Sequence, residues 1–296
     1  MLTKIQDFCR IYVKSYIYTL EVFIYMKRDA HIHSPFCPHG TKDSFELYIE
    51  KAIYNGFTDI SFTEHAPAPQ GFIDTVPDQD SFLQPNMLEP YILELQQLKK
   101  QYAKDISIKI GFEVDFIEGF ERETTQLLNE IGPTLDDSIL SVHFLLNEQK
   151  YSCIDFSPQS FIHFAQQFDS IEDVYSLYYK TVQDSISSDL GPYKPKRIGH
   201  PTLIHKFQHA HNVIVDDYEM ILKTLELMKQ NQYELDVNSA GLAKQFCLEP
   251  YPPTRYILLA KEMGIPLVFG SDAHRAEDLH QFYEDVYTQE MRKASL

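Results

Sequence analysis

Short apolar runs alternate with longer amphipathic stretches along most of this sequence. Seven runs are typical of strands: Lys27–His33, Thr58–His65, Ser107–Asp115, Ser138–Phe144, Lys196–Pro201, Tyr233–Ser239 and Pro266–Asp272. Helical stretches are expected at Phe45–Tyr54, Met87–Tyr102, Phe120–Glu130, Phe161–Phe168, Ile171–Ile186, Tyr218–Gln230, Thr254–Met263 and Glu277–Tyr287. The alternation predicts an α/β fold around a parallel sheet. At 296 residues a single closed β/α barrel is the usual form, with a doubly wound open sheet as the alternative.

Polar side chains stand at the carboxyl end of each predicted strand. They are His31 and His33, Glu64 and His65, Glu113 and Asp115, His143, His200, Asn238 and Ser239, and Asp272 and His274. In α/β barrels these ends converge on one mouth, where the active site lies. Residues i and i+2 of a strand share a face, so both members of the pairs His31/His33 and Asp272/His274 can reach that mouth.

Imidazoles and carboxylates together are ligands for zinc, iron or manganese. A carboxylate such as Glu113 among them can bridge two ions roughly 3.5–4 Å apart. A lone histidine at a strand end is usually a hydrogen-bonded core or surface residue, so the prediction depends on the whole set. His163 and His280, on predicted helices, and His209 and His211, in a polar loop, are not expected to be ligands.

The order of these motifs resembles the polymerase-and-histidinol-phosphatase (PHP) superfamily, in particular its histidinol-phosphate phosphatases. The resemblance covers about residues 26–290. It is carried by the stretches Asp29–Pro35, Phe62–Pro67, Gly111–Asp115, Ser141–His143, Ile198–His200 and Gly270–His274. The stretches Asn238–Leu242 and Glu249–Pro252 also look like the phosphatase branch.

The resemblance implies a distorted seven-stranded (β/α) barrel, TIM-like, that holds two or three divalent ions (Zn, Mn or Fe). The first ion would be held by His31, His33, Glu113 and Asp272, the second by Glu113, His143 and His200, and the third by His39, His65 and His274. Glu113 and Asp272 would thereby act in catalysis. His39 is placed only by the resemblance, since it follows the first strand in a loop.

The expected reaction is hydrolysis of L-histidinol phosphate to L-histidinol and phosphate, a step of histidine biosynthesis. Two metals lower the pKa of a shared water, so no Ser, Cys or Asp nucleophile is required. Arg197 is the predicted phosphate contact because an Arg fork matches phosphate geometry; a surface ion pair is its alternative. Ser239 and Lys244 are further expected contacts, although Ala243 stands where the family often has a basic residue. His205 or a metal-bound water is expected to protonate the leaving group.

Net charge and cysteine content limit the binding partners and the location that are expected for this chain. The formal net charge of −17 opposes binding to nucleic acid or anionic membrane. The partner that the resemblance implies is a small phosphomonoester. The sequence leaves open whether the chain forms a homo-oligomer. The cysteines, Cys9, Cys37, Cys153 and Cys247, form no CxxC pair, which favours reduced thiols in a cytoplasmic protein. Cys37 lies inside the first motif, where it is a buried structural residue or a thiol near the metals.

Residues 1–25 are expected to be an N-terminal extension, with residues 26–296 as a single barrel domain. The run from Ile11 to Tyr25 is interrupted by Lys14 and Glu21, so it is too short and too charged to cross a bilayer. It also lacks the cleavage site of a secretory signal. A peripheral membrane helix is the alternative for this segment.

Other functions share the same motifs. A phosphatase for nucleotides or for tyrosine phosphate would use the same metals, as would a nuclease. A metal-binding module without catalysis is the alternative from another class, although decayed sites usually lose ligands.

Overall fold

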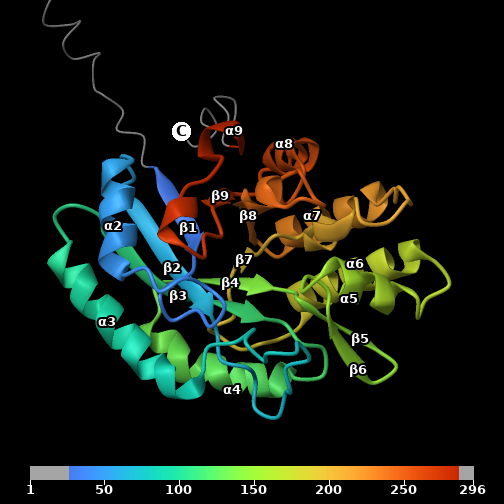
Figure 1. Cartoon of the computed structure of the whole chain (residues 1–296), viewed down its shortest axis with the longest axis horizontal. Helices are drawn as coiled ribbons and strands as arrows, with labels where there is room; N and C mark the ends of the chain where they lie inside the picture. The colour runs from blue at the N-terminus through green and yellow to red at the C-terminus, as the bar shows by residue number, and fades with distance from the viewer. Residues whose placement is uncertain (1–26, 287–296) are drawn as a thin grey trace, which may run out of the picture.

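Seven parallel strands form the central sheet of the computed structural model, which describes residues 27–286 (Figure 1). Along the sheet the strands follow the order β1-β2-β3-β4-β7-β8-β9. Their bounds are Arg28–Ile32 (β1), Asp59–His65 (β2), Ser107–Asp115 (β3), Asp137–Ser141 (β4), Arg197–Ile198 (β7), Glu234–Asn238 (β8) and Leu267–Gly270 (β9). The predicted extension, residues 1–25, lies outside the described residues.

The sheet curves until its two edge strands meet. Ile32, at the end of β1, forms a parallel bridge with Ala273, just after β9. The backbone N–H of His33 donates to the carbonyl of Ala273 at 3.0 Å, and that of Asp272 donates to His31 at 2.8 Å. These bonds nearly close a seven-stranded barrel of the TIM-like type, which confirms the predicted fold class. The end of the barrel at which the strands finish is called the mouth below.

Helices surround this barrel (Figure 1). They are α2 (Phe45–Tyr54), α3 (Leu88–Gln101), α4 (Glu121–Ile131), α5 (Pro158–Ala165), α6 (Ile171–Ser187), α7 (Tyr218–Gln230), α8 (Thr254–Glu262) and the short α9 (Tyr283–Val286). Short 3₁₀ turns occur at Pro85–Met87 (η1), Gly132–Thr134 (η2), Leu203–Phe207 (η3), Ala240–Ala243 (η4) and Ala276–Asp278 (η5). None of the helices within residues 27–286 is long and apolar enough to cross a membrane.

Local sequence signals explain where helices begin and end. The Ser44 side chain accepts a hydrogen bond from the backbone of Leu47 at the start of α2, and Gly56, with a φ of 74°, follows its end. Ser170 and Asp173 form a reciprocal capping box at the start of α6. Such caps satisfy backbone donors that the first turn leaves unpaired.

Two predicted elements are wrong. The run Ser138–Phe144 is not one strand, because β4 ends at Ser141 and Phe144 begins an antiparallel hairpin of β5 (Phe144–Asn147) and β6 (Lys150–Cys153). Glu277–Tyr287 is not one helix, because His280 and Phe282 adopt positive φ values of 63° and 56° between η5 and α9.

An aromatic cluster beside the mouth holds the long loop between β2 and η1. Phe72 and Phe82 of this loop pack with Phe144 of β5, with ring centroids 5.1 Å and 5.5 Å from it. Ile117, after β3, completes the buried cluster. Because interiors pack closely, this cluster fixes the loop against the hairpin and so forms one wall of the mouth.

Candidate metal centre and active site

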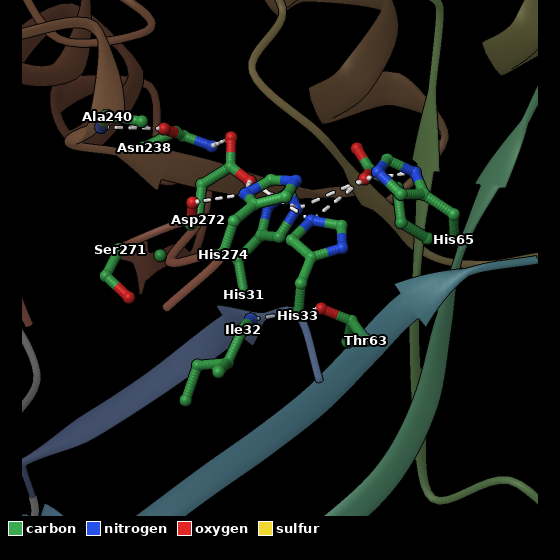
Figure 2. Close-up of polar contacts among 12 residues, drawn as sticks. His31, Ile32, His33, Thr63, His65, Asn238, Ala240, Ser271, Asp272 and His274 are labelled. Atoms are coloured by element: carbon green, nitrogen blue, oxygen red, sulfur yellow. Dashed lines mark hydrogen bonds and ion pairs between the residues drawn. The ribbon is translucent and has the colours of Figure 1, made fainter. Parts of the chain in front are cut away.

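The predicted ligands gather at the mouth. Figure 2 shows the side chains of His31, His33, His65, Asp272 and His274 pointing toward one another, while Ile32 points to the opposite side of β1. His31 comes from β1 and His33 follows it, His65 ends β2, and Asp272 and His274 follow β9. The alternation of a strand explains why His31 and His33 share this face.

Glu113, on β3, lies at the centre of this group, and its two carboxylate oxygens face different imidazoles. Oε2 lies 3.4 Å from His31 Nε2, 3.5 Å from His33 Nε2 and 3.3 Å from His65 Nδ1. Oε1 lies 2.8 Å from His200 Nε2 and 3.7 Å from His143 Nε2. A carboxylate with this arrangement can serve two adjacent cations, one through each oxygen.

Asp272 faces the histidines of β1. Its Oδ1 lies 3.1 Å from His33 Nε2 and 3.6 Å from His31 Nε2. The amide of Asn238, on β8, donates to Oδ2 at 3.2 Å (Figure 2). Asp272 therefore presents Oδ1 to the centre, while its Oδ2 accepts the hydrogen bond from Asn238.

A second group of imidazoles lies beside the first. The ring centroid of His39 is 5.0 Å from those of both His65 and His274, which are 5.8 Å from each other. The Sγ atom of Cys37 lies within 4.8 Å of ring nitrogens of His33, His65 and His274. The structure thus brings His39 to the mouth from its loop and places the Cys37 thiol against the same group.

Acidic side chains orient the ring nitrogens that face away from the centre. Nδ1 of His31 lies 2.9 Å from Asp236, that of His33 lies 3.3 Å from Glu64, and that of His143 lies 2.6 Å from Asp115. Backbone carbonyls do the same for His39 (Asp80, 2.9 Å) and His274 (Asp272, 3.0 Å). Such partners fix the ring and the tautomer of metal-binding histidines.

These orienting roles are not predicted from the sequence. Glu64 and Asp115 had been noted only as polar strand ends. Asp236 had not been singled out, although it stands two residues before Asn238 on β8. That i,i+2 spacing was the available signal, because it places both side chains on the inner face of the barrel.

Buried carboxylates and imidazoles at the site strongly shift the pKa values of one another. Burial alone would raise the pKa of Glu113, but the charges of His31 and His143 and the hydrogen bond from His200 hold it well below its usual range. Burial opposes the charged form of His33 and His143, yet neighbouring carboxylates raise their pKa values to about 9 and about 10. The negative carboxylates thus favour positive charge at this position in the barrel, which suits a cation-binding site.

His65 gives a direct test of whether the residues fit a metal. Its pKa is held well below the usual value, first by burial and then by the charge of His33. Its side chain is buried, and neither ring nitrogen has a hydrogen-bond partner among the described residues. Buried polar atoms are nearly always satisfied, so a neutral imidazole in this state fits a coordinating role. The donor set suits a borderline divalent ion.

Two of these residues have unusual backbone conformations. His200, with a φ of 24°, and Asp272, with a φ of 52°, lie in the left-handed region. Non-glycine residues in this region cost energy and cluster at functional sites. Next to His200, a Cβ on Gly199 would meet the Ser141 hydroxyl at 2.1 Å, so the close approach of β4 to the chain after β7 requires glycine.

A cavity of about 620 Å³ opens over the centre. Three cationic side chains line it: Lys206 on η3, Lys244 after η4, and Arg275 after β9. The Lys206 ammonium pairs with Asp155 Oδ2 at 2.9 Å, and Arg275 pairs with Asp278 at 2.7 Å. The cavity is thus large enough for a small phosphate ester, and cations stand around its metal-binding floor.

Arg197 requires a correction, because it does not line this cavity. Its buried guanidinium lies between the barrel strands, where Nη2 donates to the Ala30 carbonyl at 2.8 Å and to Asp137 at 3.0 Å. Asp137 opens β4 and Arg197 opens β7. Arg197 therefore pairs with a residue at the strand-start end of the barrel, away from the mouth.

Two other expected substrate-site residues are also placed elsewhere. The Ser239 hydroxyl is buried and donates to the carbonyl of Gln281 at 2.7 Å. His205 is buried between Asp217, at 2.6 Å, and Glu249, at 2.7 Å. Neither lines the cavity, so Ser239 is not placed to contact substrate there and His205 is not placed to protonate the leaving group. Lys244 does line the cavity and remains a candidate substrate contact.

Comparison with known proteins places this site in a family. Residues 29–240 match the family model of the PHP domain. A histidinol-phosphatase from Bacillus subtilis is 45% identical over 260 residues, which cover 87% of this chain and 97% of that protein. HisK of Listeria monocytogenes, a candidate histidinol phosphatase, has a crystal structure that matches with a TM-score of 0.84 at 40% identity, over 88% of this chain and 99% of that one.

A more distant structure shares the fold. Histidinol phosphate phosphatase from Lactococcus lactis subsp. lactis, solved with zinc, L-histidinol and phosphate, matches with a TM-score of 0.69 at 21% identity, over 92% of this chain and 94% of that one. The family match spans well over half of the sequence and contains seven of the nine candidate ligands. This chain therefore belongs to the PHP domain family.

Proposed function

We propose that this protein is a metal-dependent histidinol-phosphatase, a phosphoric monoester hydrolase that converts L-histidinol phosphate to L-histidinol and phosphate. The observation that carries the proposal is the 45% identity to the Bacillus subtilis histidinol-phosphatase over nearly all of that protein. In this chain the similarity is accompanied by a complete set of imidazoles and carboxylates at the mouth. The reaction belongs to histidine biosynthesis.

The residues that would hold the metals form three sets. His31, His33, Glu113 and Asp272 make the first, Glu113, His143 and His200 the second, and His39, His65 and His274 the third. These sets accommodate two or three divalent ions, and we propose zinc, manganese or iron. Such ions, when bound, activate water for attack on phosphorus and neutralise charge on the phosphoryl oxygens.

Lys206 is the side chain best placed to bind the phosphate. Burial opposes its charge, but Asp155 raises its pKa above the ordinary value. Lys206 therefore remains a fixed positive charge, and an ammonium with its three donors can bind phosphoryl oxygens as the charge on them grows. Lys244 and Arg275, on other walls of the cavity, can neutralise the remaining phosphate charge.

Orientation of the ligands is the second task of the protein residues. Asp236, Glu64 and Asp115 hold the outward nitrogens of His31, His33 and His143, so the inward nitrogens stay free for coordination. Fixed orientation of the coordinating groups is a condition for efficient electrostatic catalysis.

Turnover of L-histidinol phosphate tests the proposal against its alternatives. Metal-loaded protein is assayed for phosphate release from L-histidinol phosphate, from phosphotyrosine and from a nucleoside monophosphate. The proposal predicts the highest kcat/KM for L-histidinol phosphate. A clear preference for phosphotyrosine or the nucleotide would identify another PHP phosphoesterase, and metal-loaded protein that cleaves none of them would be a binding module.

We also propose that the enzyme acts in the cytoplasm. The three cysteines of the described residues, Cys37, Cys153 and Cys247, are all free thiols. Thiols persist in reducing compartments, which supports this location. An extract fractionated into cytoplasm and membrane should contain the protein in the cytoplasmic fraction.

A further inference from the structure

Phe156 presents an aromatic face to the cavity. It lies in the loop between β6 and α5, lines the cavity, and is 45% exposed. Within residues 27–286 it makes no ring contact with another aromatic side chain. Tyr251 also lines the cavity, but its side chain is only 1% exposed. An accessible aromatic ring in the wall of a cavity is available to contact a ligand bound there.

Neighbouring residues hold Phe156 in place. Asp155 precedes it and is fixed by the Lys206 ammonium at 2.9 Å and by the thiol of Cys153 at 3.1 Å. Ser157 follows it and caps α5 by accepting from the backbone of Ser160 at 3.1 Å. Both sides of Phe156 are thus anchored, so binding a ligand against its ring costs little ordering entropy.

The same loop links the aromatic face to the proposed phosphate contact. Asp155 positions Lys206, and the adjacent Phe156 lines the same cavity. A substrate with phosphate at one end and a flat heteroaromatic ring at the other matches this pair of features. Imidazole rings stack on phenyl rings, and such pairs contribute beyond the area they bury.

We propose that Phe156 determines substrate specificity by stacking on the imidazole ring of L-histidinol phosphate. This inference rests on the proposed function, since it names the group that selects that substrate. Phe156 contacts the substrate and takes no part in metal binding or in the chemistry at phosphorus.

Steady-state kinetics on two substrates test the proposal. L-Alaninol phosphate shares the amine and the phosphate of L-histidinol phosphate but carries hydrogen in place of the imidazole ring. Phe156→Ala should lower kcat/KM for L-histidinol phosphate roughly tenfold, mainly through KM, and change that for L-alaninol phosphate less than about twofold. Phe156→Tyr should retain the wild-type preference. Tyr54→Ala, a change at a 90% exposed ring of α2 outside the cavity, is the matched control and should behave like wild type.

Inhibition by the free alcohols, L-histidinol and L-alaninol, is a second measurement. It reports how tightly each alcohol binds, separately from how fast its phosphate ester is hydrolysed. Phe156→Ala should weaken inhibition by L-histidinol roughly tenfold and leave that by L-alaninol unchanged. Equal losses on both substrates, or no loss on L-histidinol phosphate, would overturn the role of Phe156 while leaving the phosphatase assignment intact. Wild-type protein with no preference for L-histidinol phosphate would instead refute the proposed function.

Discussion

Glu113 is the residue on which the proposed centre depends most, since its two oxygens face separate groups of imidazoles. Glu113→Gln keeps the shape but removes the charge, and an amide NH₂ cannot coordinate. We expect kcat to fall on the order of 10³-fold and the metal content to drop by at least one ion per chain. Phosphate-release kinetics and elemental analysis of the same samples check this.

The matched control is Glu226→Gln, at an exposed position of α7. It should retain both activity and metal. Full activity in Glu113→Gln would show that the centre described above is not the active site, even if the protein is an enzyme.

Lys206 replaces Arg197 as the predicted phosphate contact. Lys206→Ala should reduce kcat/KM for phosphomonoesters by about 10²-fold, since a charge-assisted hydrogen bond to a phosphoryl oxygen is lost, while the metal content stays unchanged. Lys180→Ala, on the exposed face of α6, should have no effect. Wild-type kinetics in Lys206→Ala would exclude the phosphate contact, and loss of metal would assign Lys206 a structural role instead.

The error on Arg197 has a simple physical origin. Sequence spacing places Arg197 three residues before His200, which is roughly 10 Å along an extended strand, and therefore toward the opposite end of the barrel. The rule that active sites lie at the carboxyl ends of strands already favoured residues after β7. Lys206 meets that condition, but it lies on a 3₁₀ turn whose path the sequence did not reveal.

At the scale of elements, strands and helices with regular hydrophobic patterns are predicted more accurately than the irregular segments between them. The bounds of β3, α2 and α7 match the predicted ranges, because each has a clear period and clear end signals. The β5–β6 hairpin was missed, since its register depends on tertiary contacts such as the Phe72–Phe144 pair. The predicted last helix is interrupted at His280, whose ring stacks on Phe57 and bonds to Asp29.

The buried cluster around His205 joins three elements and should make stability depend on pH. Burial opposes the charge of His205, but hydrogen bonds to Asp217 and Glu249 raise its pKa above 6.5. A raised pKa in the folded state stabilises the fold fully below the unfolded value near 6.5, and this contribution is lost as the pH rises through the folded value. His205→Gln should therefore lower the free energy of unfolding by about 3 kcal/mol near pH 6 and by less near pH 9.

Urea unfolding of metal-loaded wild type and variant at both pH values measures this difference. Tyr179→Phe is the control, because it removes the hydroxyl bonded to Asp217 without removing a group that titrates in this range. Its cost should be the same at both pH values. A cost of His205→Gln that does not change with pH would show that folding does not raise the pKa of this ring.

At the scale of the whole molecule, the barrel and the gathering of distant ligands follow from strand order. β1 and β9 lie at opposite ends of the sequence, yet closure between Ile32 and Ala273 brings His31 and His33 beside Asp272 and His274. The sequence predicts that these side chains lie together only if the strands are assumed to form a barrel. Local sequence patterns carry no information on whether the first and last strands pair. The cavity walls, which include the segments that follow β2 and β4, could not be predicted from those patterns.

The domain boundary remains a prediction. Residues 1–25 lie outside the described residues, and every proposed ligand follows them in the sequence. Removal of residues 1–25 should leave metal content unchanged and kcat/KM within about twofold of the full chain, because no catalytic group is lost. An insoluble or inactive truncated protein would instead make this segment part of the fold.

Metal removal and restoration test whether the ions at the mouth carry the phosphatase activity. Protein stripped with a chelator is titrated with zinc, manganese or iron(II), and phosphate release from L-histidinol phosphate is measured at each addition, with L-histidinol quantified in the same samples. We expect no activity in the stripped protein, recovery that saturates at two or three ions per chain, and equal amounts of phosphate and L-histidinol. Fully metal-loaded protein that releases no phosphate from L-histidinol phosphate, or stripped protein that retains full activity, would contradict this expectation.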